Sequence, residues 1–160
     1  MQLRTLDISY AQLAVFQSAL AEPFNDWTDA YLAQGFAWRP GSVSFATIEP
    51  SGPIEVEVVR GAPPLASSSA SRVIAVPFSI AEDEAVDVAS IGDGEALTLP
   101  AGSYCLTFEH GLLDDGSMWC RLSFEAVSGK VEPKVVRAGD LAPSEPLLMD
   151  ASPRNDSASR

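Results

Sequence analysis

Residues 54–60 read "IEVEVVR" and carry the clearest strand pattern in the chain. Ile54, Val56 and Val58 alternate with Glu55 and Glu57, so one face of this segment is apolar and the other is charged. A period of two is typical of a β-strand that has one face in a core and the other in water. We therefore predict a half-buried strand here.

Similar short runs, separated by turn-forming residues such as "EPSGP", "GDG", "PAG" and "DDG", occupy most of the chain. In the run 5–10, Tyr10 falls on the same face as Leu6 and Ile8, and in the run 42–48 Val43 shares a face with Phe45. About eight or nine such strands predict a mainly β fold, an antiparallel sandwich or barrel. The other predicted strands are 5–10, 12–17, 42–48, 72–80, 85–91, 96–99, 103–110 and 118–127.

One short helix is predicted at about residues 26–34. Asp26 is placed to cap its first amides, Asp29 complements the positive end of the helix dipole, and Gly35 ends the helix. Trp27 is then an anchor of the helix on the sheet.

The last two predicted strands form a hairpin around "GLLDDG" (111–116). Counting outward from that loop places Cys105 near Cys120, and we expect both thiols to be reduced. His110, the one histidine in the chain, is expected to be exposed to solvent at the end of its strand.

The 160 residues are enough for a single domain with a proper core. We assign residues 1–137 to one β-rich domain with a flexible surface loop at 61–71, and residues 138–160 to a Pro/Ser-rich tail that is disordered after Asp150. No signal-peptide pattern and no apolar run long enough to span a bilayer are visible, so we expect a cytoplasmic protein without a membrane partner.

Catalytic patterns are missing from the sequence. It contains no GxSxG, no phosphate-binding loop, no GxGxxG and no cysteine spacing typical of zinc. We expect a protein that is not an enzyme and that needs no cofactor or metal.

Charge is the unusual property. Ten basic and 22 acidic residues give a formal net charge of −12, which disfavours direct nucleic-acid binding and favours a basic partner. No lysine or arginine occurs in the 48 residues between Arg72 and Arg121, and most of the acids there fall in predicted turns. If those turns share one end of the fold, their field steers a basic protein to that end. The acids that we predict to contact a partner are Glu82, Asp83, Glu84, Asp87, Asp93, Glu95, Asp114 and Asp115.

Two other interpretations of this acidity remain open. Charged turns commonly do no more than keep a domain soluble. Turns such as "GDGE" and "DDG" also supply the oxygen ligands of calcium, although no EF-hand spacing is present, so a calcium- or ligand-binding sandwich is the alternative function.

The order of several segments resembles that of the competence protein J family, whose members are small cytoplasmic inhibitors of a DNA-entry nuclease. The resemblance covers roughly residues 5–127. The segments that carry it are "LDISYAQLAVFQ" (6–17), "NDWTDAYLAQGFAWRPGSVSF" (25–45), "VIAVPFSI" (73–80) and "LTLPAGSYCLTFEH" (97–110).

This resemblance implies an antiparallel β-rich domain that binds a basic DNase and blocks its DNA-binding cleft, either for DNA uptake or as immunity against a nuclease weapon. Carboxylates offered in place of phosphates agree with that role. The motif "DWTD" includes Asp26, Trp27 and Asp29, which we rank second as a contact surface because a helix start already explains them. The oligomeric state is left open.

Overall fold

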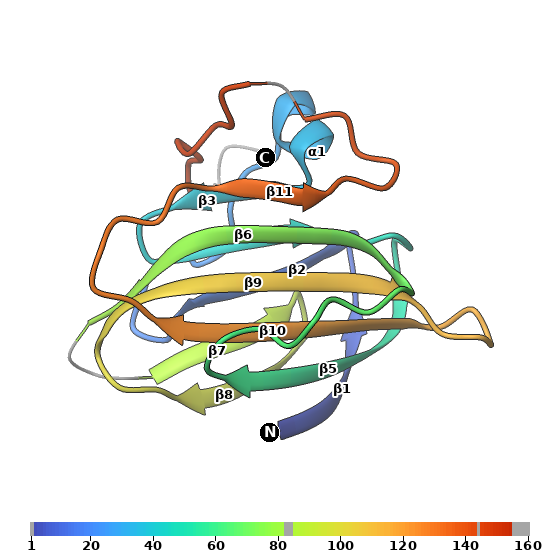
Figure 1. Cartoon of the computed structure of the whole chain (residues 1–160), viewed down its shortest axis with the longest axis horizontal. Helices are drawn as coiled ribbons and strands as arrows, with labels where there is room; N and C mark the ends of the chain where they lie inside the picture. The colour runs from blue at the N-terminus through green and yellow to red at the C-terminus, as the bar shows by residue number, and fades with distance from the viewer. Residues whose placement is uncertain (1, 82–84, 144, 155–160) are drawn as a thin grey trace.

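The computed structural model describes residues 2–81, 85–143 and 145–154. In this part of the chain, eleven strands and one short helix are present. The strands form two sheets that pack face to face (Figure 1) and do not close into a barrel. The predicted β-rich fold is confirmed, and the sandwich is the architecture observed.

Sheet A has six strands. Its neighbouring strands are antiparallel except for β5 and β10, which run parallel and so depart from the predicted arrangement. In spatial order, sheet A consists of β1 (Gln2–Ile8), β5 (Gly52–Arg60), β10 (Met118–Ala126), β9 (Gly102–Leu112), β6 (Ala70–Ile80) and β11 (Lys134–Arg137).

Sheet B has five strands, all antiparallel to their neighbours. In spatial order it consists of β3 (Phe36–Arg39), β4 (Ser42–Ala46), β2 (Gln12–Gln17), β7 (Ala85–Ser90) and β8 (Asp93–Thr98). Neither β3 nor β11 was predicted, because each is a four-residue edge strand and too short to show an alternation.

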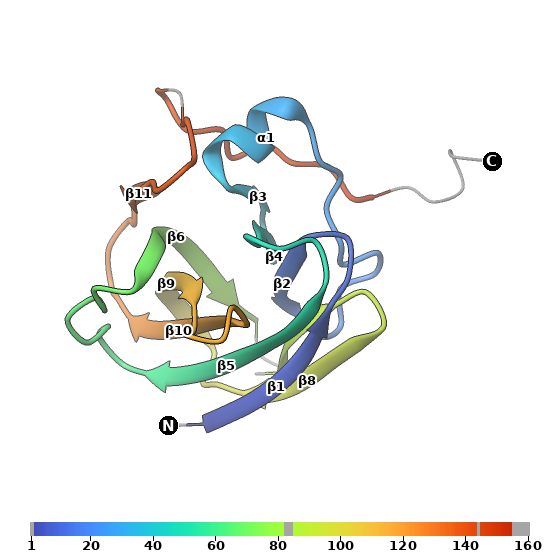
Figure 2. The same cartoon turned by 90° about the vertical axis from the view of Figure 1, so that its right-hand side faces the viewer.

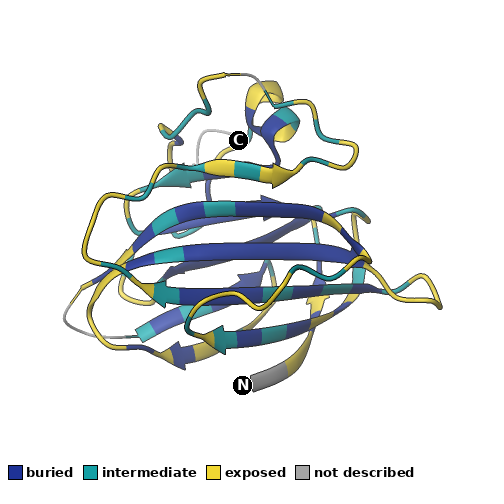
Figure 3. Cartoon of the chain, viewed as in Figure 1, coloured by how far each residue is buried: buried dark blue, intermediate teal, exposed yellow. Residues whose placement is uncertain are grey.

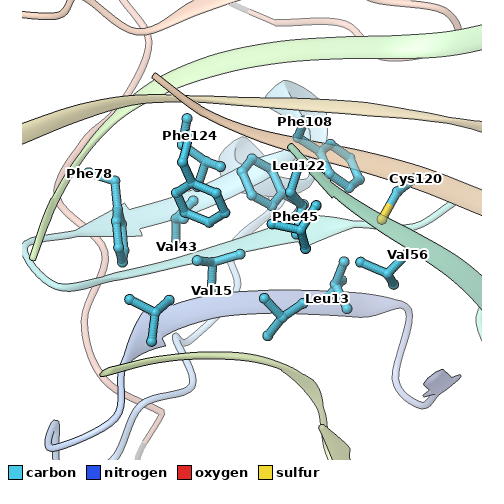
Figure 4. Packing of buried hydrophobic residues seen from close by; sticks show 14 of the residues in the cluster. Leu13, Val15, Val43, Phe45, Val56, Phe78, Phe108, Cys120, Leu122 and Phe124 are labelled. Atoms are coloured by element: carbon cyan, nitrogen blue, oxygen red, sulfur yellow. The ribbon is translucent and has the colours of Figure 1, made fainter. Parts of the chain in front are cut away.

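The core lies between the two sheets and follows the predicted alternation. Ile54, Val56 and Val58 of β5 are buried, whereas Glu55 is exposed. Phe45 of sheet B stacks on Phe108 of sheet A with ring centroids 4.3 Å apart, so this pair joins the two sheets directly (Figure 4). Figure 3 shows long buried stretches along β6 and β9 of sheet A, and in sheet B every residue of β4 is buried.

The segment between β5 and β6 crosses the outer face of sheet A, in front of β10 and β9 (Figure 1). It was predicted as a flexible surface loop. In the structure, Arg121 donates a hydrogen bond to the carbonyl of Leu65 at 3.3 Å, and Arg137 donates one to the carbonyl of Ser67 at 2.9 Å. The segment is on the surface, as predicted, and two arginines fix its backbone against the sheet.

The chain after β11 passes over the helix and β3 (Figure 2). Leu141, Leu147 and Met149 pack against the main core, and Ala151 is buried. The backbone N–H of Ala151 donates to the carbonyl of Trp38, which partly covers the edge of β3. The predicted domain boundary at residue 137 stays a prediction, and most of the disorder predicted after Asp150 falls on residues 155–160, outside the described part of the chain.

The helix α1 (Asp29–Gln34) is shorter than predicted. Thr28, and not Asp26, caps it: the Thr28 side chain accepts a hydrogen bond from the backbone N–H of Tyr31. Gly35 ends the helix in the left-handed region at φ 90°, as predicted. Within the described residues, no helix has the length and apolar character needed to cross a membrane.

The hairpin of β9 and β10 is confirmed, but its predicted register is wrong. Leu112 pairs with Met118, so Cys105 lies opposite Glu125 and Cys120 lies opposite His110. The strand β9 continues through Gly111 and Leu112, which the prediction had assigned to the turn, and this moves the centre of the turn along the chain. The two cysteines are not cross-strand neighbours, and both are free thiols.

Candidate functional site

Four connections meet at one end of the sandwich, which we call the four-turn end. They join β1 to β2, β4 to β5, β7 to β8 and β9 to β10, through residues 9–11, 47–51, 91–92 and 113–117. The Ser90 hydroxyl donates to the carbonyl of Ser9 at 3.0 Å, and the backbone N–H of Ala11 donates to the carbonyl of Pro50 at 2.9 Å. Three of the four connections are therefore linked to one another, and the fourth begins where β9 ends beside them (Figure 2).

Three of the predicted contact acids lie at this end, and all three are exposed. Asp93 begins β8, and its carboxylate accepts the backbone N–H of Asp7 at 2.8 Å. Asp114 and Asp115 lie in the turn between β9 and β10. Glu95, two residues further along β8, forms a 3.5 Å ion pair with Arg4 of β1.

One further predicted acid of the described residues, Asp87, does not join them. Asp87 lies within β7, where its carboxylate accepts a hydrogen bond from the Ser18 hydroxyl at 2.9 Å. Glu82, Asp83 and Glu84 lie outside the described residues. The strand that precedes them ends at Ile80, which pairs with Gly102 at the opposite end of sheet A from Leu112. Of the predicted contact acids in the described residues, Asp93, Asp114 and Asp115 share the four-turn end, and the role of the whole set stays a prediction.

Two acids of the four-turn end were missed. Asp7 lies next to the last residue of β1, and Glu49 lies in the connection from β4 to β5. Both side chains are exposed. Glu49 directly follows the predicted strand 42–48, which was a usable signal, whereas Asp7 lies inside the predicted strand 5–10 and no turn pattern marks it.

The motif "DWTD" acts mainly as the start of the helix. Trp27 packs against the cluster of Tyr31, Ala37 and Ala151, and its indole N–H donates to the side chain of Gln12 at 3.3 Å. Asp29 is the acidic residue of the first helical turn. The prediction that a helix start explains the motif holds for Asp29 but not for Asp26, and its second-ranked role as a contact surface stays a prediction.

His110 is fully buried, so the prediction of an exposed histidine is wrong. Its Nε2 accepts the backbone N–H of Ile48 at 2.9 Å, which leaves Nδ1 to donate to the carbonyl of Trp119 at 2.8 Å. Burial lowers the pKa of His110 to about 4, so the ring is neutral at neutral pH. The histidine joins the loop after β4 to sheet A.

Beside His110, Arg72 is buried and donates to the carbonyl of Ala46 at 2.7 Å and to the carboxylate of Asp140 at 3.0 Å. The guanidinium of Arg72 lowers the pKa of Asp140 through this hydrogen bond. Arg72 and Asp140 therefore neutralise each other next to the four-turn end.

Within residues 2–81, 85–143 and 145–154, no three histidine, cysteine, aspartate or glutamate side chains are grouped as ligands for a metal ion.

The family model and the relative that match this chain agree with each other. The family model described as Competence protein J (ComJ) matches residues 5–125 of the chain. A DNA-entry nuclease inhibitor of Bacillus subtilis (strain 168) is 30% identical over 103 residues, which are 64% of this chain and 76% of that protein.

Two solved structures share the fold. The crystal structure of ComJ, inhibitor of the DNA degrading activity of NucA, from Bacillus subtilis, has a TM-score of 0.71 and 25% identity, over 79% of this chain and 96% of that chain. A structure named Crocagin biosynthetic gene J has a TM-score of 0.51 at 12% identity, over 80% of this chain and 100% of that one, and is similar in fold alone. Since the family model covers most of the sandwich and a relative at 30% identity agrees with it, this chain belongs to the competence protein J family.

Proposed function

We propose that this protein is a non-enzymatic inhibitor that binds a DNA-degrading nuclease and blocks its DNA-binding cleft. The observation that carries the proposal is the 30% identity with a DNA-entry nuclease inhibitor, which extends over 76% of that relative. The inhibitor acts in the cytoplasm, before the nuclease is exported or meets DNA.

The charge of the chain supports this role on physical grounds. A nuclease that holds a phosphate backbone presents positive charge or a metal ion at its cleft. A partner with a net charge of −12 is attracted to such a cleft over long range and competes there with the DNA phosphates.

The test is a DNA-degradation assay of the DNA-entry type nuclease of the same organism, with and without the purified protein. We expect cleavage to fall in proportion to added protein and to stop near one inhibitor per nuclease. Bovine serum albumin at equal concentration controls for non-specific protection. Undiminished cleavage at a several-fold excess of inhibitor would contradict the proposal.

Salt dependence gives an independent prediction. Because long-range attraction acts on the encounter, raising the salt from 0.05 to 0.5 M is expected to slow association about tenfold or more and to change dissociation less than about threefold. Surface plasmon resonance with immobilised nuclease measures both rates. An association rate that does not respond to salt would show that charge does not guide the encounter.

A further inference from the structure

Large apolar side chains are exposed on two turns of the four-turn end, the one after β1 and the one after β9. Tyr10 is 71% exposed, Leu112 37% and Leu113 36%. The other large apolar residues that are exposed in the described part of the chain are scattered. Leu32 lies on α1, Leu65 in the segment between β5 and β6, and Val136 on β11.

The backbone holds Tyr10 out of the core. The sequence pattern had placed it on the inner face of a strand, but that strand ends at Ile8 and Tyr10 lies in the following turn at φ 57°. Its neighbour Ala11 has φ 55° and is hydrogen-bonded on both sides, to Pro50 and to Thr47. Left-handed conformations are unfavourable for both residue types. Ser9 and Gln12 are bridged across Tyr10 and Ala11, so a two-residue turn with φ above zero at both positions holds the ring outside the core.

The turn between β9 and β10 is similarly well defined. The carboxylate of Asp115 accepts hydrogen bonds from the backbone N–H of Ser117 at 3.0 Å and from its hydroxyl at 2.6 Å. These bonds lower the pKa of Asp115, so it is charged at neutral pH. The backbone N–H of Leu113 donates to the carbonyl of Ser117 at 2.7 Å, which closes the turn. Leu113 and Asp114 are thus presented by a rigid tip.

The same end already holds a basic side chain. The guanidinium carbon of Arg154 lies 5.6 Å from the centre of the Tyr10 ring, which is a cation–π arrangement. Arg154 comes from the C-terminal segment, whose backbone is fixed by a 2.8 Å hydrogen bond from its N–H to the carbonyl of Phe24. The surface around Tyr10 therefore has the chemistry to accept an arginine.

We infer that the four-turn end is the surface that contacts the nuclease, through exposed apolar side chains on two turns, which we call the centre, and carboxylates on the same end, which we call the rim. This inference rests on the proposed function. The centre consists of Tyr10, Leu112 and Leu113, and the rim consists of Asp7, Glu49, Asp93, Asp114 and Asp115.

The partner that fits this end is a basic protein cleft. Stable interfaces combine a few apolar or aromatic anchors at the centre with a polar rim. The five rim carboxylates are exposed, the nearby Arg72 is paired with Asp140, and Arg154 on the Tyr10 ring is a positive charge at this end. An arginine of the nuclease takes a place on Tyr10 like that of Arg154, while the rim carboxylates face the groups that bind phosphate.

A charge-reversal pair tests the rim. Glu49→Lys with Asp114→Lys is compared with Glu125→Lys and Glu132→Lys, which change the net charge equally but lie away from this end. We expect the rim pair to slow association with the nuclease about tenfold or more, and the control pair to slow it about threefold or less. Both are measured by surface plasmon resonance at 0.1 M salt, after circular dichroism has confirmed folding.

A single substitution tests the centre. Tyr10→Asn keeps a residue that tolerates φ above zero, and Leu65→Asn is the control at another exposed apolar position. We expect Tyr10→Asn to speed dissociation about tenfold to a hundredfold, and the control to leave it within about twofold.

The outcomes separate the inference from the proposed function. If the wild-type protein does not inhibit the nuclease, the proposed function itself is contradicted. The other case is that the wild type inhibits the nuclease, the rim and control pairs slow association equally, and Tyr10→Asn leaves dissociation unchanged. Those results would support the proposed function and contradict this contact surface.

Discussion

Replacing Arg121 with alanine is expected to lower the free energy of unfolding by about 3–5 kcal/mol. Arg121 makes two 2.7 Å hydrogen bonds to the carboxylate of Glu109, whose side chain is 1% exposed. The pair lies on the outer face of sheet A, beneath the segment between β5 and β6, where Arg121 also donates to the carbonyl of Leu65. Without the arginine, a buried carboxylate loses its charged partner and its hydrogen-bond donors together.

The size of this effect distinguishes a buried pair from a surface pair, which is worth about 1 kcal/mol or less. Urea denaturation at pH 7 measures it. Arg121→Met with Glu109→Gln removes both charges and is expected to cost at least about 2 kcal/mol less than Arg121→Ala, because no unpaired charge remains. A loss below about 1 kcal/mol in Arg121→Ala would show that solvent reaches Glu109 and screens the pair.

The sequence was informative about which residues face the core. Burial of one face gives a strand a period of two, and Ile54, Val56 and Val58 followed it. The same pattern gave a wrong prediction for Tyr10. Alternation alone does not show where a strand ends, and the turn "SYA" has no glycine or asparagine to mark it. Edge strands such as β3 were missed for a related reason, since four residues contain too few alternations.

Pairing and three-dimensional clustering were harder to predict. The register of the hairpin depends on where β9 ends, and extending it through Leu112 separated Cys105 from Cys120. The contact of Asp93 in sheet B with Asp7 in sheet A depends on how the two sheets pack, which no local pattern shows.

The burial of His110 was also beyond the sequence. A histidine near the end of a predicted strand and before a glycine resembles an exposed residue. In the fold, β9 extends past it, and the loop after β4 covers the ring and supplies the Ile48 N–H. The partner of this side chain is 62 residues away along the chain, so no local pattern indicates it.

Acidification from pH 7 to pH 4 is expected to remove about 3 kcal/mol of stability through His110 alone. Burial lowers its pKa to about 4 in the folded state, against about 6.5 in the unfolded chain. Between these values the unfolded state binds more protons than the folded state, so stability falls as the pH falls. The geometry gives the reason: protonated Nε2 would place an N–H against the N–H of Ile48, where two donors repel.

The charged neighbours of His110 have opposite effects on its pKa. Arg72 disfavours the imidazolium and Asp140 favours it, while the hydrogen bond to the carbonyl of Trp119 also favours it, so burial remains the main cause. The pKa of Asp140 is itself lowered by Arg72, so its contribution to stability is lost only below the usual aspartate range. The loss of stability through His110 falls in the window from about pH 6.5 to pH 4.

The matched control is His110→Gln, whose amide oxygen accepts the Ile48 N–H and does not titrate. Urea denaturation of both proteins at pH 7, 5.5 and 4 gives the comparison. Relief of acidic self-repulsion is common to both proteins and cancels in the difference. The wild type is expected to lose about 3 kcal/mol more than the variant by pH 4. Parallel pH profiles would mean that the ring accepts a proton without leaving its buried site.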